Sequence, residues 1–401
     1  MQDTKPKMNI LGYLPNETPP FGQLVLLGIQ HVLTMFPATA LASILMKFPV
    51  STALMVTGIG TVLVLLFSRL AIKKYIPLYY GASFAYIASV QAIMNAKGVT
   101  GPVAPPNVIS VVTAGFIATG VINIIVGIII KLSGGKKAID LILPPIITGS
   151  VACTIGIGLG ASALANASGT CCGVADPGMQ LRWWAVALIT MLAAFLFSVY
   201  LQGKGFIGML PILLAAIVGY VVSIPLGLVD FAAFGQEQLV RVPSLTMPVF
   251  NDPLTLTVIV GVGVMAIATI PESTAHLYQI SLYVDHLADE QKKPRYELDK
   301  HIGFNLVLDG INDIINGSLG SPAGTNYGEN NSLMVITRNY SGPALIVAGL
   351  LAILLGIFGP LAEAVASIPT AVSGGLSIYL FGVIGMQGIA LLLSEKVNLY
   401  D

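Results

Sequence analysis

Apolar stretches of about twenty residues recur along the whole chain, and they limit its possible folds more than any other feature. A helix that rises 1.5 Å per residue needs about that many apolar residues to cross the hydrocarbon core of a membrane. Charged residues make up only 9% of the 401 residues and hydrophobic ones 55%, which leaves too few charges to cover a soluble surface of this size. A β-barrel would show shorter segments of alternating polarity. The sequence therefore predicts an all-α polytopic membrane protein.

Twelve segments qualify as membrane spans. They are 22–46, 49–67, 78–96, 108–130, 138–164, 183–202, 206–228, 254–284, 301–319, 325–338, 343–363 and 368–393. Residues 1–21 form a segment before the first span. Residues 229–253 form the connection that divides a first half, 22–228, from a second half, 254–393.

The basic residues predict the orientation of these spans. If the N-terminus is cytoplasmic, fifteen of the nineteen Lys and Arg residues lie on the cytoplasmic side, and the outer side holds only Lys47, Lys97, Arg182 and Arg241. Such an excess is what the positive-inside rule predicts. With an even number of spans, both termini are expected in the cytoplasm. The protein is expected in the plasma membrane, which is the inner membrane in a cell that has two membranes.

Two spans begin with related and interrupted sequences. Tyr80-Gly81-Ala82-Ser83-Phe84 opens the third span, and Tyr327-Gly328-Glu329-Asn330 opens the tenth. The offset of seven spans is odd, so the halves enter the membrane with opposite topology, as in the inverted repeats of secondary transporters. Broken spans at matching positions of such repeats indicate a substrate site, because irregular backbone at membrane depth must be buried in protein or line a cavity. The alternative is that these Gly and Pro residues only kink their helices.

Ionisable side chains lie within apolar sequence at Glu272, His276 and Glu329. A charge in the middle of a bilayer is costly, so such groups normally face a bundle interior or a cavity and mark a substrate or proton path. His276 follows Glu272 by four residues, which places both on one helical face. A mutually satisfied buried pair with no ligand is the structural alternative.

The segment from Tyr327 to Arg338 resembles the signature of the nucleobase-ascorbate transporters, also called type 2 nucleobase/cation symporters. Gln30-His31, the stretch 81–85, and Glu272 with His276 match further features of that family. The resemblance runs from about residue 22 to the end, and bacterial uracil permeases look closest. That family has fourteen spans in two sets of seven, so this chain is expected to be short by two C-terminal spans, a 7+5 arrangement.

The resemblance implies an architecture and a function. Spans 1–4 and 8–11 would form a core domain that carries the site, and spans 5–7 and 12 a gate domain, with alternating access between them and a homodimer as the assembly. The implied function is import of a nucleobase, uracil first, by proton symport, with a xanthine or other purine permease as the alternative. The implied substrate-binding positions are Phe84, Glu272, His276, Tyr327, Gly328 and Glu329.

These residue types suit a flat, uncharged heterocycle. Glu272 and Glu329 can accept ring N–H groups, the N–H of Gly328 can donate to a carbonyl, and Phe84 and Tyr327 can cover the ring face. Two nearby carboxylates in a low-dielectric cavity cannot both stay ionised cheaply, so one is expected to carry a proton that moves with the ligand. The proton is the one coupling agent expected, with no other cofactor and no metal.

Further polar residues are expected to support the site or the proton path. His31 is expected either to brace the third or tenth segment or simply to pack, and Asn330 belongs to the same tenth segment. Asp309 is expected to support the tenth segment or proton movement. Asp313, by contrast, is expected to face the cytoplasm in contact with water.

Composition also excludes some classes of protein. The formal net charge is zero, and no basic cluster is interleaved with aromatic residues, so nucleic-acid binding is not expected. Cys153, Cys171 and Cys172 show neither zinc spacing nor a disulfide framework. An anion exchanger of similar fold is a rival, but acids at 272 and 329 would repel an anion. A metal-dependent intramembrane enzyme would need a second His nearby, so an enzyme is not expected.

Overall fold

The computed structural model describes residues 12–133, 145–202, 204, 207–208, 210–229, 231 and 238–394. Seven helical stretches in this part of the chain are long and apolar enough to cross a membrane, namely Phe21–Leu45, Val50–Ile72, Pro106–Ser133, Gly149–Ser168, Pro177–Tyr200, Thr255–Glu290 and Thr370–Ala390. Shorter apolar helices cover Phe84–Ala96, Pro211–Ser223 and Gly342–Ile357. The predicted all-α membrane fold is therefore confirmed.

Every predicted span contains helix. In chain order the helices are α1 (Phe21–Leu45), α2 (Val50–Ile72), α3 (Ile87–Ala96), α4 (Pro106–Ser133), α6 (Pro145–Gly158), α7 (Gly160–Ser168), α8 (Pro177–Tyr200), α9 (Pro211–Ser223), α10 (Thr255–Gly263), α11 (Ala266–Glu290), α12 (Ile302–Leu319), α13 (Gly328–Thr337), α14 (Gly342–Ile357), α15 (Gly359–Ala366) and α16 (Thr370–Ser394). The predicted fifth, eighth and eleventh spans each consist of two helices, which meet near Leu159, Val264 and Phe358. Residues 1–11 of the predicted N-terminal segment and 138–144 of the fifth span lie outside the described residues.

The third and tenth spans are discontinuous, as predicted. Each begins with a short strand, β1 (Tyr80–Ala82) or β2 (Gly324–Asn326), and continues as a short helix, α3 or α13. The strands pair antiparallel, with Gly81 opposite Thr325 at the centre. The backbone N–H and C=O groups of the two strands, which lack helical partners, therefore bond to each other. Such pairing is needed because unpaired backbone groups are costly inside a bilayer.

Helix packing follows the seven-span offset. The second span packs on the eleventh as α2 on α14, and the symmetry-related pair, the ninth on the fourth, packs as α12 on α4. Both interfaces depend on glycine: a Cβ at Gly58 would lie 2.5 Å from the Gly349 carbonyl oxygen, and one at Gly310 would lie 2.4 Å from that of Gly120. Close backbone approach at small residues is how membrane helices gain packing contact. The inverted repeat is therefore visible in the packing as well as in the sequence.

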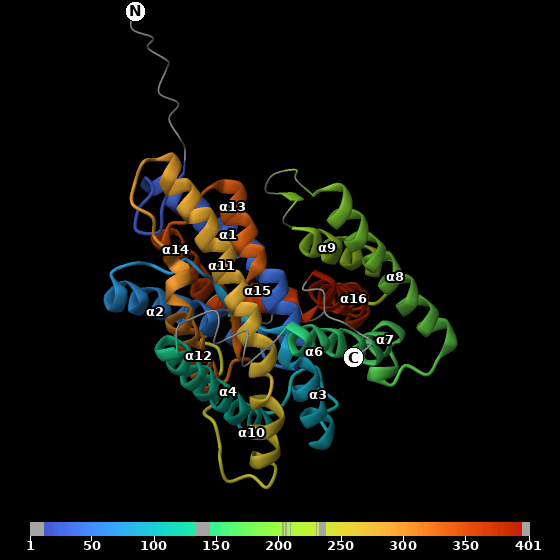
Figure 1. Cartoon of the computed structure of the whole chain (residues 1–401). Helices are drawn as coiled ribbons and strands as arrows, with labels where there is room; N and C mark the ends of the chain where they lie inside the picture. Colours follow the sequence, from blue (N-terminus) through green and yellow to red (C-terminus); the bar gives the residue numbers. More distant parts are fainter. Residues whose placement is uncertain are drawn as a thin grey trace, which may run out of the picture.

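Two groups of helices stand apart in the molecule. Helices α7, α8, α9 and α16 lie on one side in Figure 1, and α2, α4, α11, α12 and α13 lie on the other. Within the first group, α16 packs against α6, α7 and α8. Helices α11 and α13, which carry most of the predicted site residues, belong to the second group.

The connection between the halves contacts the ends of several helices in its described part, from residue 238 onward. The backbone N–H of Arg241 donates to the carbonyl of Ile357 at the end of α14 (2.9 Å). Asp252, just before α10, pairs with Lys97 at the end of α3 at 2.7 Å. The hydrogen bond from Lys97 lowers the pKa of the Asp252 carboxyl. The connection thus ties α3, α14 and α10 together at one end of the bundle.

Candidate functional site

Four predicted site residues gather where α11 meets the start of α13. Glu272 and His276 lie on α11, and Gly328 and Glu329 form the first turn of α13. Glu272 lies within electrostatic range of both His276 and Glu329. Glu272 is exposed in the single chain, while His276, Gly328 and Glu329 are partly exposed. These groups are therefore accessible rather than sealed inside packed protein.

His276 has a defined orientation. Its Nδ1 atom lies 2.9 Å from the backbone oxygen of Asn326 and 2.7 Å from the Asn326 Oδ1 atom. Because both partners are acceptors, Nδ1 carries the proton and donates, which leaves Nε2 as an acceptor. A Cβ at Gly328 would lie 2.9 Å from that Nε2 atom. The imidazole thus lies directly against the N-terminus of α13, in space that only glycine leaves open.

The start of α13 supplies hydrogen-bond donors. An α-helix leaves its first N–H groups without helical acceptors, and its N-terminus carries partial positive charge. Tyr327 occupies the N-cap position but its side chain does not cap the helix. Carboxylate acceptors, an imidazole acceptor and backbone donors therefore occur together at this place, as the hydrogen-bonding edge of a planar amide-like ring requires.

Tyr327 braces the broken segments instead of lining the site. Its side chain is 4% exposed, and its hydroxyl donates to the Ala82 carbonyl at 2.9 Å and lies 2.9 Å from the Thr39 hydroxyl. Its ring covers Gly81, where a Cβ would lie 2.3 Å from ring carbons. The ring face of Tyr327 thus packs against protein. It is therefore not positioned to cover a ligand, contrary to the expectation from the sequence.

Phe84 keeps part of its side chain accessible. It begins a short 3-10 turn, η1 (Phe84–Tyr86), directly after β1, and Ser83 caps this turn by accepting the N–H of Ala85 at 3.3 Å. The phenyl group packs at the border of the two hydrophobic clusters of the protein. Of the two predicted aromatic walls, Phe84 is the one whose ring is not enclosed.

His31 and Asn330 link the first helix to the tenth segment. The Asn330 Nδ2 atom donates to His31 Nδ1 at 3.0 Å and to the His31 backbone oxygen at 3.1 Å. Both side chains are fully buried. Since His31 Nδ1 accepts, its proton resides on Nε2. Of the two roles expected for His31, these hydrogen bonds correspond to bracing the tenth segment.

A buried polar network supports His276 from behind. The Asn326 Nδ2 atom donates to the Ser273 hydroxyl at 2.6 Å and to Asp309 Oδ1 at 3.4 Å. Asn305 also donates to Ser273, at 2.7 Å. Asp309 is 5% exposed, so it lies next to the support of His276 rather than in the site.

The expectation of a water-exposed Asp313 was wrong. Asp313 is fully buried. Its Oδ1 accepts the N–H of Gly324 in β2 at 2.9 Å, and its Oδ2 accepts the side-chain amide of Asn123 in α4 at 3.0 Å. The physical reason is that β2 is an edge strand whose N–H needs an acceptor inside the membrane.

Sequence reasoning missed several supporting residues. Asn326 bonds to His276 and Thr39 to Tyr327, and Ser273 bonds to Asn326. Asn123 bonds to Asp313, which holds β2 in place. One signal was present: Asn326 and Ser273 each stand directly beside a residue that was singled out. Their partners, however, lie far away in the chain, so adjacency alone could not assign them.

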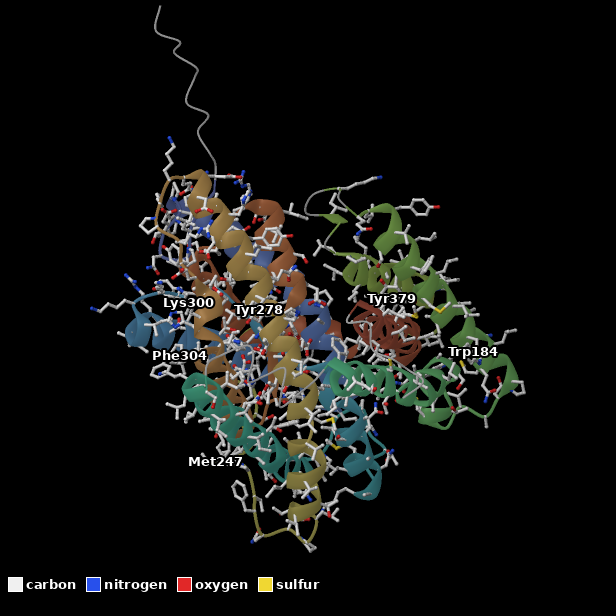
Figure 2. All side chains as sticks on the ribbon, viewed as in Figure 1. Trp184, Met247, Tyr278, Lys300, Phe304 and Tyr379 are labelled. Atoms are coloured by element: carbon white, nitrogen blue, oxygen red, sulfur yellow. The ribbon has the colours of Figure 1, made fainter. Side chains whose placement is uncertain are left out.

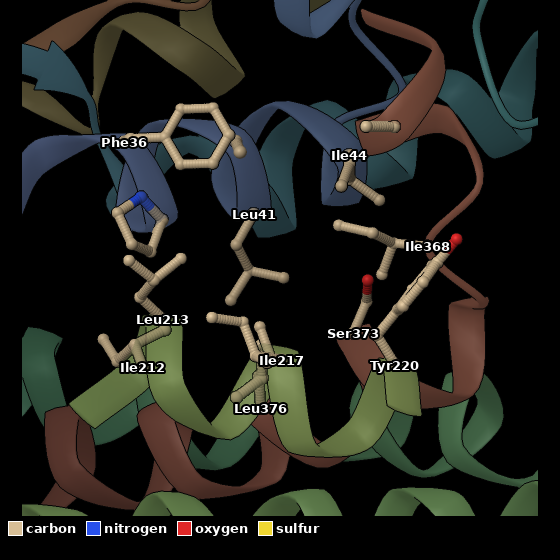
Figure 3. Close-up of a pocket in the computed structure, with 14 residues that line it drawn as sticks. Phe36, Leu41, Ile44, Ile212, Leu213, Ile217, Tyr220, Ile368, Ser373 and Leu376 are labelled. Carbon is tan, nitrogen blue, oxygen red and sulfur yellow. The ribbon is translucent and has the colours of Figure 1, made fainter. Parts of the chain in front are cut away.

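The structure also contains an apolar cavity away from these residues. This cavity, of about 330 Å³, lies between α1, α9 and the start of α16. Figure 3 shows Leu41 of α1 facing Ile217 of α9 and Leu376 of α16. Its walls offer almost no hydrogen-bonding groups, so it is not suited to the polar edge of a small heterocycle.

Comparisons with known proteins bear on the assignment. A family model with the description "Permease family" (Xan_ur_permease) matches residues 22–400. The chain belongs to this permease family. The permease is 33% identical to the uracil permease of Bacillus caldolyticus over 388 residues, which cover 95% of the chain and 82% of that relative. It is 32% identical to the uracil permease of Escherichia coli strain K12 and 29% identical to the putative pyrimidine permease RutG of the same strain, with 96% of the chain covered in each case and 82% and 81% of the relatives.

Solved structures share the fold of this permease. The transmembrane domain of the cyanobacterium bicarbonate transporter BicA matches with a TM-score of 0.65 at 14% identity, covering 95% of this chain and 96% of that one. The murine anion transporter Slc26a9, in its inward-facing state, matches with a TM-score of 0.66 at 11% identity over 96% of this chain and 63% of that one. At such identities the likeness establishes the fold alone. The permease is accordingly a multi-pass membrane protein.

Proposed function

We propose that this permease imports uracil, together with a proton, by alternating access. The observation that carries the proposal is the meeting of Glu272, His276 and Glu329 with the N-terminus of α13 at an accessible place. Relatives named uracil permease, at 32–33% identity over nearly the whole chain, support uracil as the first substrate to test.

The hydrogen-bonding pattern of the site suits uracil. Uracil offers two ring N–H donors and two carbonyl acceptors along its edge. The carboxylates of Glu272 and Glu329 and the free Nε2 of His276 accept N–H groups, while the first N–H groups of α13 donate to a carbonyl. Phe84 offers a ring face for stacking. An anion would meet two carboxylates and be repelled, although the solved structures of this fold include a bicarbonate transporter.

Proton coupling follows from the two acids. Two carboxylates within electrostatic range of each other repel unless one of them is protonated. A proton bound at this pair favours uptake of a neutral ligand, and it leaves with the ligand when the site opens to the cytoplasm. Glu272, Glu329 and His276 are the proposed carriers, with Asp309 behind them.

The moving parts are the two groups of helices. The core comprises α1–α4 and α10–α15, and the gate comprises α6–α9 and α16. The apolar cavity between α1, α9 and α16 supports this division, because a seam with few hydrogen bonds can slide at low cost. We further propose that the protein is located in the plasma membrane as a homodimer, with both termini in the cytoplasm.

Binding and uptake measurements test this function. Purified protein is reconstituted in liposomes, and uptake of labelled uracil is measured with and without an inward proton gradient. We expect uracil to compete fully and xanthine or adenine weakly. Glu272→Gln and Glu329→Gln should abolish gradient-driven uptake, while Glu297→Gln, which removes an exposed carboxylate paired with Lys300, should leave it unchanged.

Three outcomes would contradict the proposal. Uptake that ignores both the gradient and a protonophore would exclude proton symport. Competition by xanthine but not by uracil would transfer the assignment to a purine permease, and competition by bicarbonate alone would make the protein an anion exchanger.

A further inference from the structure

Cys171 and Cys172 are adjacent residues in a loop remote from the proposed binding residues. They belong to a single 3-10 turn, η2 (Thr170–Cys172), between α7 and α8. Gly169 and Gly173 flank this turn with φ of +79° and +74°, values that residues other than glycine rarely adopt. The ring of Trp183 packs on Gly169, where a Cβ would lie 2.9 Å away. The loop therefore bends at both glycines and is packed against Trp183 on one side, at the end of the molecule near the labelled Trp184 in Figure 2.

The two thiols are close together and accessible. Their Sγ atoms lie 2.7 Å apart, and both residues are exposed. Cys153, the remaining cysteine, is partly buried in α6, where its Sγ donates to the Gly385 carbonyl at 3.5 Å. The chain thus has one reagent-accessible pair and one internal reference thiol.

The surroundings of the pair favour reaction at Cys172. A hydrogen bond from the Cys171 thiol lowers the pKa of Cys172 to about 6, with help from Thr370 and the positive charge of Lys47. The same interaction raises the pKa of Cys171. Thiolates are the nucleophiles in thiol chemistry, so Cys172 attacks and Cys171 follows.

We propose that Cys171 and Cys172 are a reversible redox modification site, a vicinal dithiol that closes to a disulfide within the loop by exchange with a small external disulfide such as oxidised glutathione. The Cys172 thiolate attacks one sulfur of the oxidant and releases one glutathione thiolate, which takes the Cys171 proton. The Cys171 thiolate then attacks the Cys172 sulfur and releases the second glutathione as a thiolate, which takes up the proton that Cys172 had lost. In total, two protein thiols are oxidised, one oxidised glutathione is reduced to two thiols, and no other reactant is needed.

The disulfide is expected to be readily reversed. Adjacent Cα atoms across a trans peptide are about 3.8 Å apart, whereas most disulfides join Cα atoms separated by roughly 4.4–6.8 Å. A ring closed between neighbours is therefore strained, and strained or exposed disulfides are the easily reduced, regulatory kind. The orientation predicted from the basic residues places this loop outside the cell, where disulfides persist.

The position of the loop gives the modification a consequence. Lys47 lies at the end of α1, Thr370 begins α16, and both lie within interaction range of the pair. A Cβ at Gly374 of α16 would lie 2.4 Å from the backbone nitrogen of Ala167 in α7, so the ends of these helices abut. Ring closure alters the loop where α1 meets α16. We expect it to slow initial uptake about twofold or more without changing uracil affinity, a consequence that rests on the proposed function.

The test uses the full chain in liposomes or detergent. Protein is incubated with mixtures of oxidised and reduced glutathione, remaining thiols are trapped with N-ethylmaleimide, and the intact mass is measured. Wild-type protein and Cys153→Ser should lose two alkylatable thiols without gaining glutathione, and excess reduced glutathione should restore them. Cys171→Ser should stop at a mixed disulfide with one glutathione on Cys172.

The possible results separate the chemistry from its effect. Wild-type protein that keeps both accessible thiols, or that accumulates glutathione adducts, would overturn the proposal. A disulfide that forms while uptake stays constant would remove its role in transport and leave the modification site in place. Because mass analysis requires no transport, failure of the uracil assignment would not be mistaken for failure of this site.

Discussion

Replacing Gly328 with alanine tests how tightly the site is built. The added methyl carbon would lie 2.9 Å from His276 Nε2, closer than the roughly 3.5–4.0 Å of relaxed contact between heavy atoms. His276 cannot simply turn away, since its Nδ1 is bonded to two oxygens of Asn326 at 2.9 and 2.7 Å. The imidazole must therefore move at the expense of these bonds.

The size of the effect follows from the bonds at stake. Each hydrogen bond contributes about 0.5–1.5 kcal/mol net, so displacing His276 costs about 1–3 kcal/mol. The free protein can relax by letting the imidazole shift, whereas a ligand needs it in place. The cost should therefore appear in the binding free energy, as a roughly 5- to 150-fold rise in the Kd for uracil, because about 1.4 kcal/mol is a factor of ten.

Isothermal titration calorimetry on purified protein measures this change. Gly261→Ala is the matched control, because a Cβ at that position of α10 meets no described heavy atom within 4 Å. In the His276→Ala background the methyl no longer meets a ring, so the additional penalty of Gly328→Ala should shrink to below about 0.5 kcal/mol. A Kd within twofold of wild type, or an equal penalty in both backgrounds, would refute this reasoning.

Two further substitutions test the fold around the site. Asp313→Leu leaves the Gly324 N–H and the Asn123 amide without their acceptor, which costs about 1–3 kcal/mol for each buried unpaired group. Its unfolding temperature in detergent should therefore fall well below that of Asp313→Asn, which keeps one acceptor oxygen. Equal unfolding temperatures for the two variants would contradict the assigned bonds. Lys97→Ala removes the partner that lowers the pKa of Asp252. The wild type should therefore be more stable than this variant above the ordinary Asp pKa of 3.8, and this difference in stability should vanish as the pH falls through the lower folded-state pKa. A stability difference that grows in acid would show that the pair has another role.

Local patterns in the sequence were sufficient for the membrane helices and for the breaks in the third and tenth spans, but not for those in the fifth, eighth and eleventh. Long apolar runs give the helices, since only a helix satisfies its own backbone in lipid. Gly and Pro at the starts of the third and tenth spans predict the interruptions that the strands around Gly81 and Gly324 display. The spacing of four between Glu272 and His276 likewise predicts a shared helical face, which α11 provides.

The burial and contacts of residues whose partners lie far away in the chain could not be predicted from local sequence patterns. The burial of Asp313 follows from the place of β2 beside α12, which brings an unpaired Gly324 N–H to the carboxylate. The role of Tyr327 follows from strand register, because the residue beneath its ring is Gly81, in the other half of the chain. One sequence without a fold gives no means of matching these partners.

The glycine contacts between α2 and α14, and between α4 and α12, restrict how this protein can change shape. Where Gly310 meets Gly120 and Gly58 meets Gly349, backbone atoms of the two helices come close together, and side chains such as Ile124 and Ile353 pack against the same glycines. A shift by one helical turn would bring larger residues into spaces that hold only hydrogen atoms. Each pair, α2 with α14 and α4 with α12, is therefore expected to move as a unit, and any sliding between groups of helices has to occur at other interfaces.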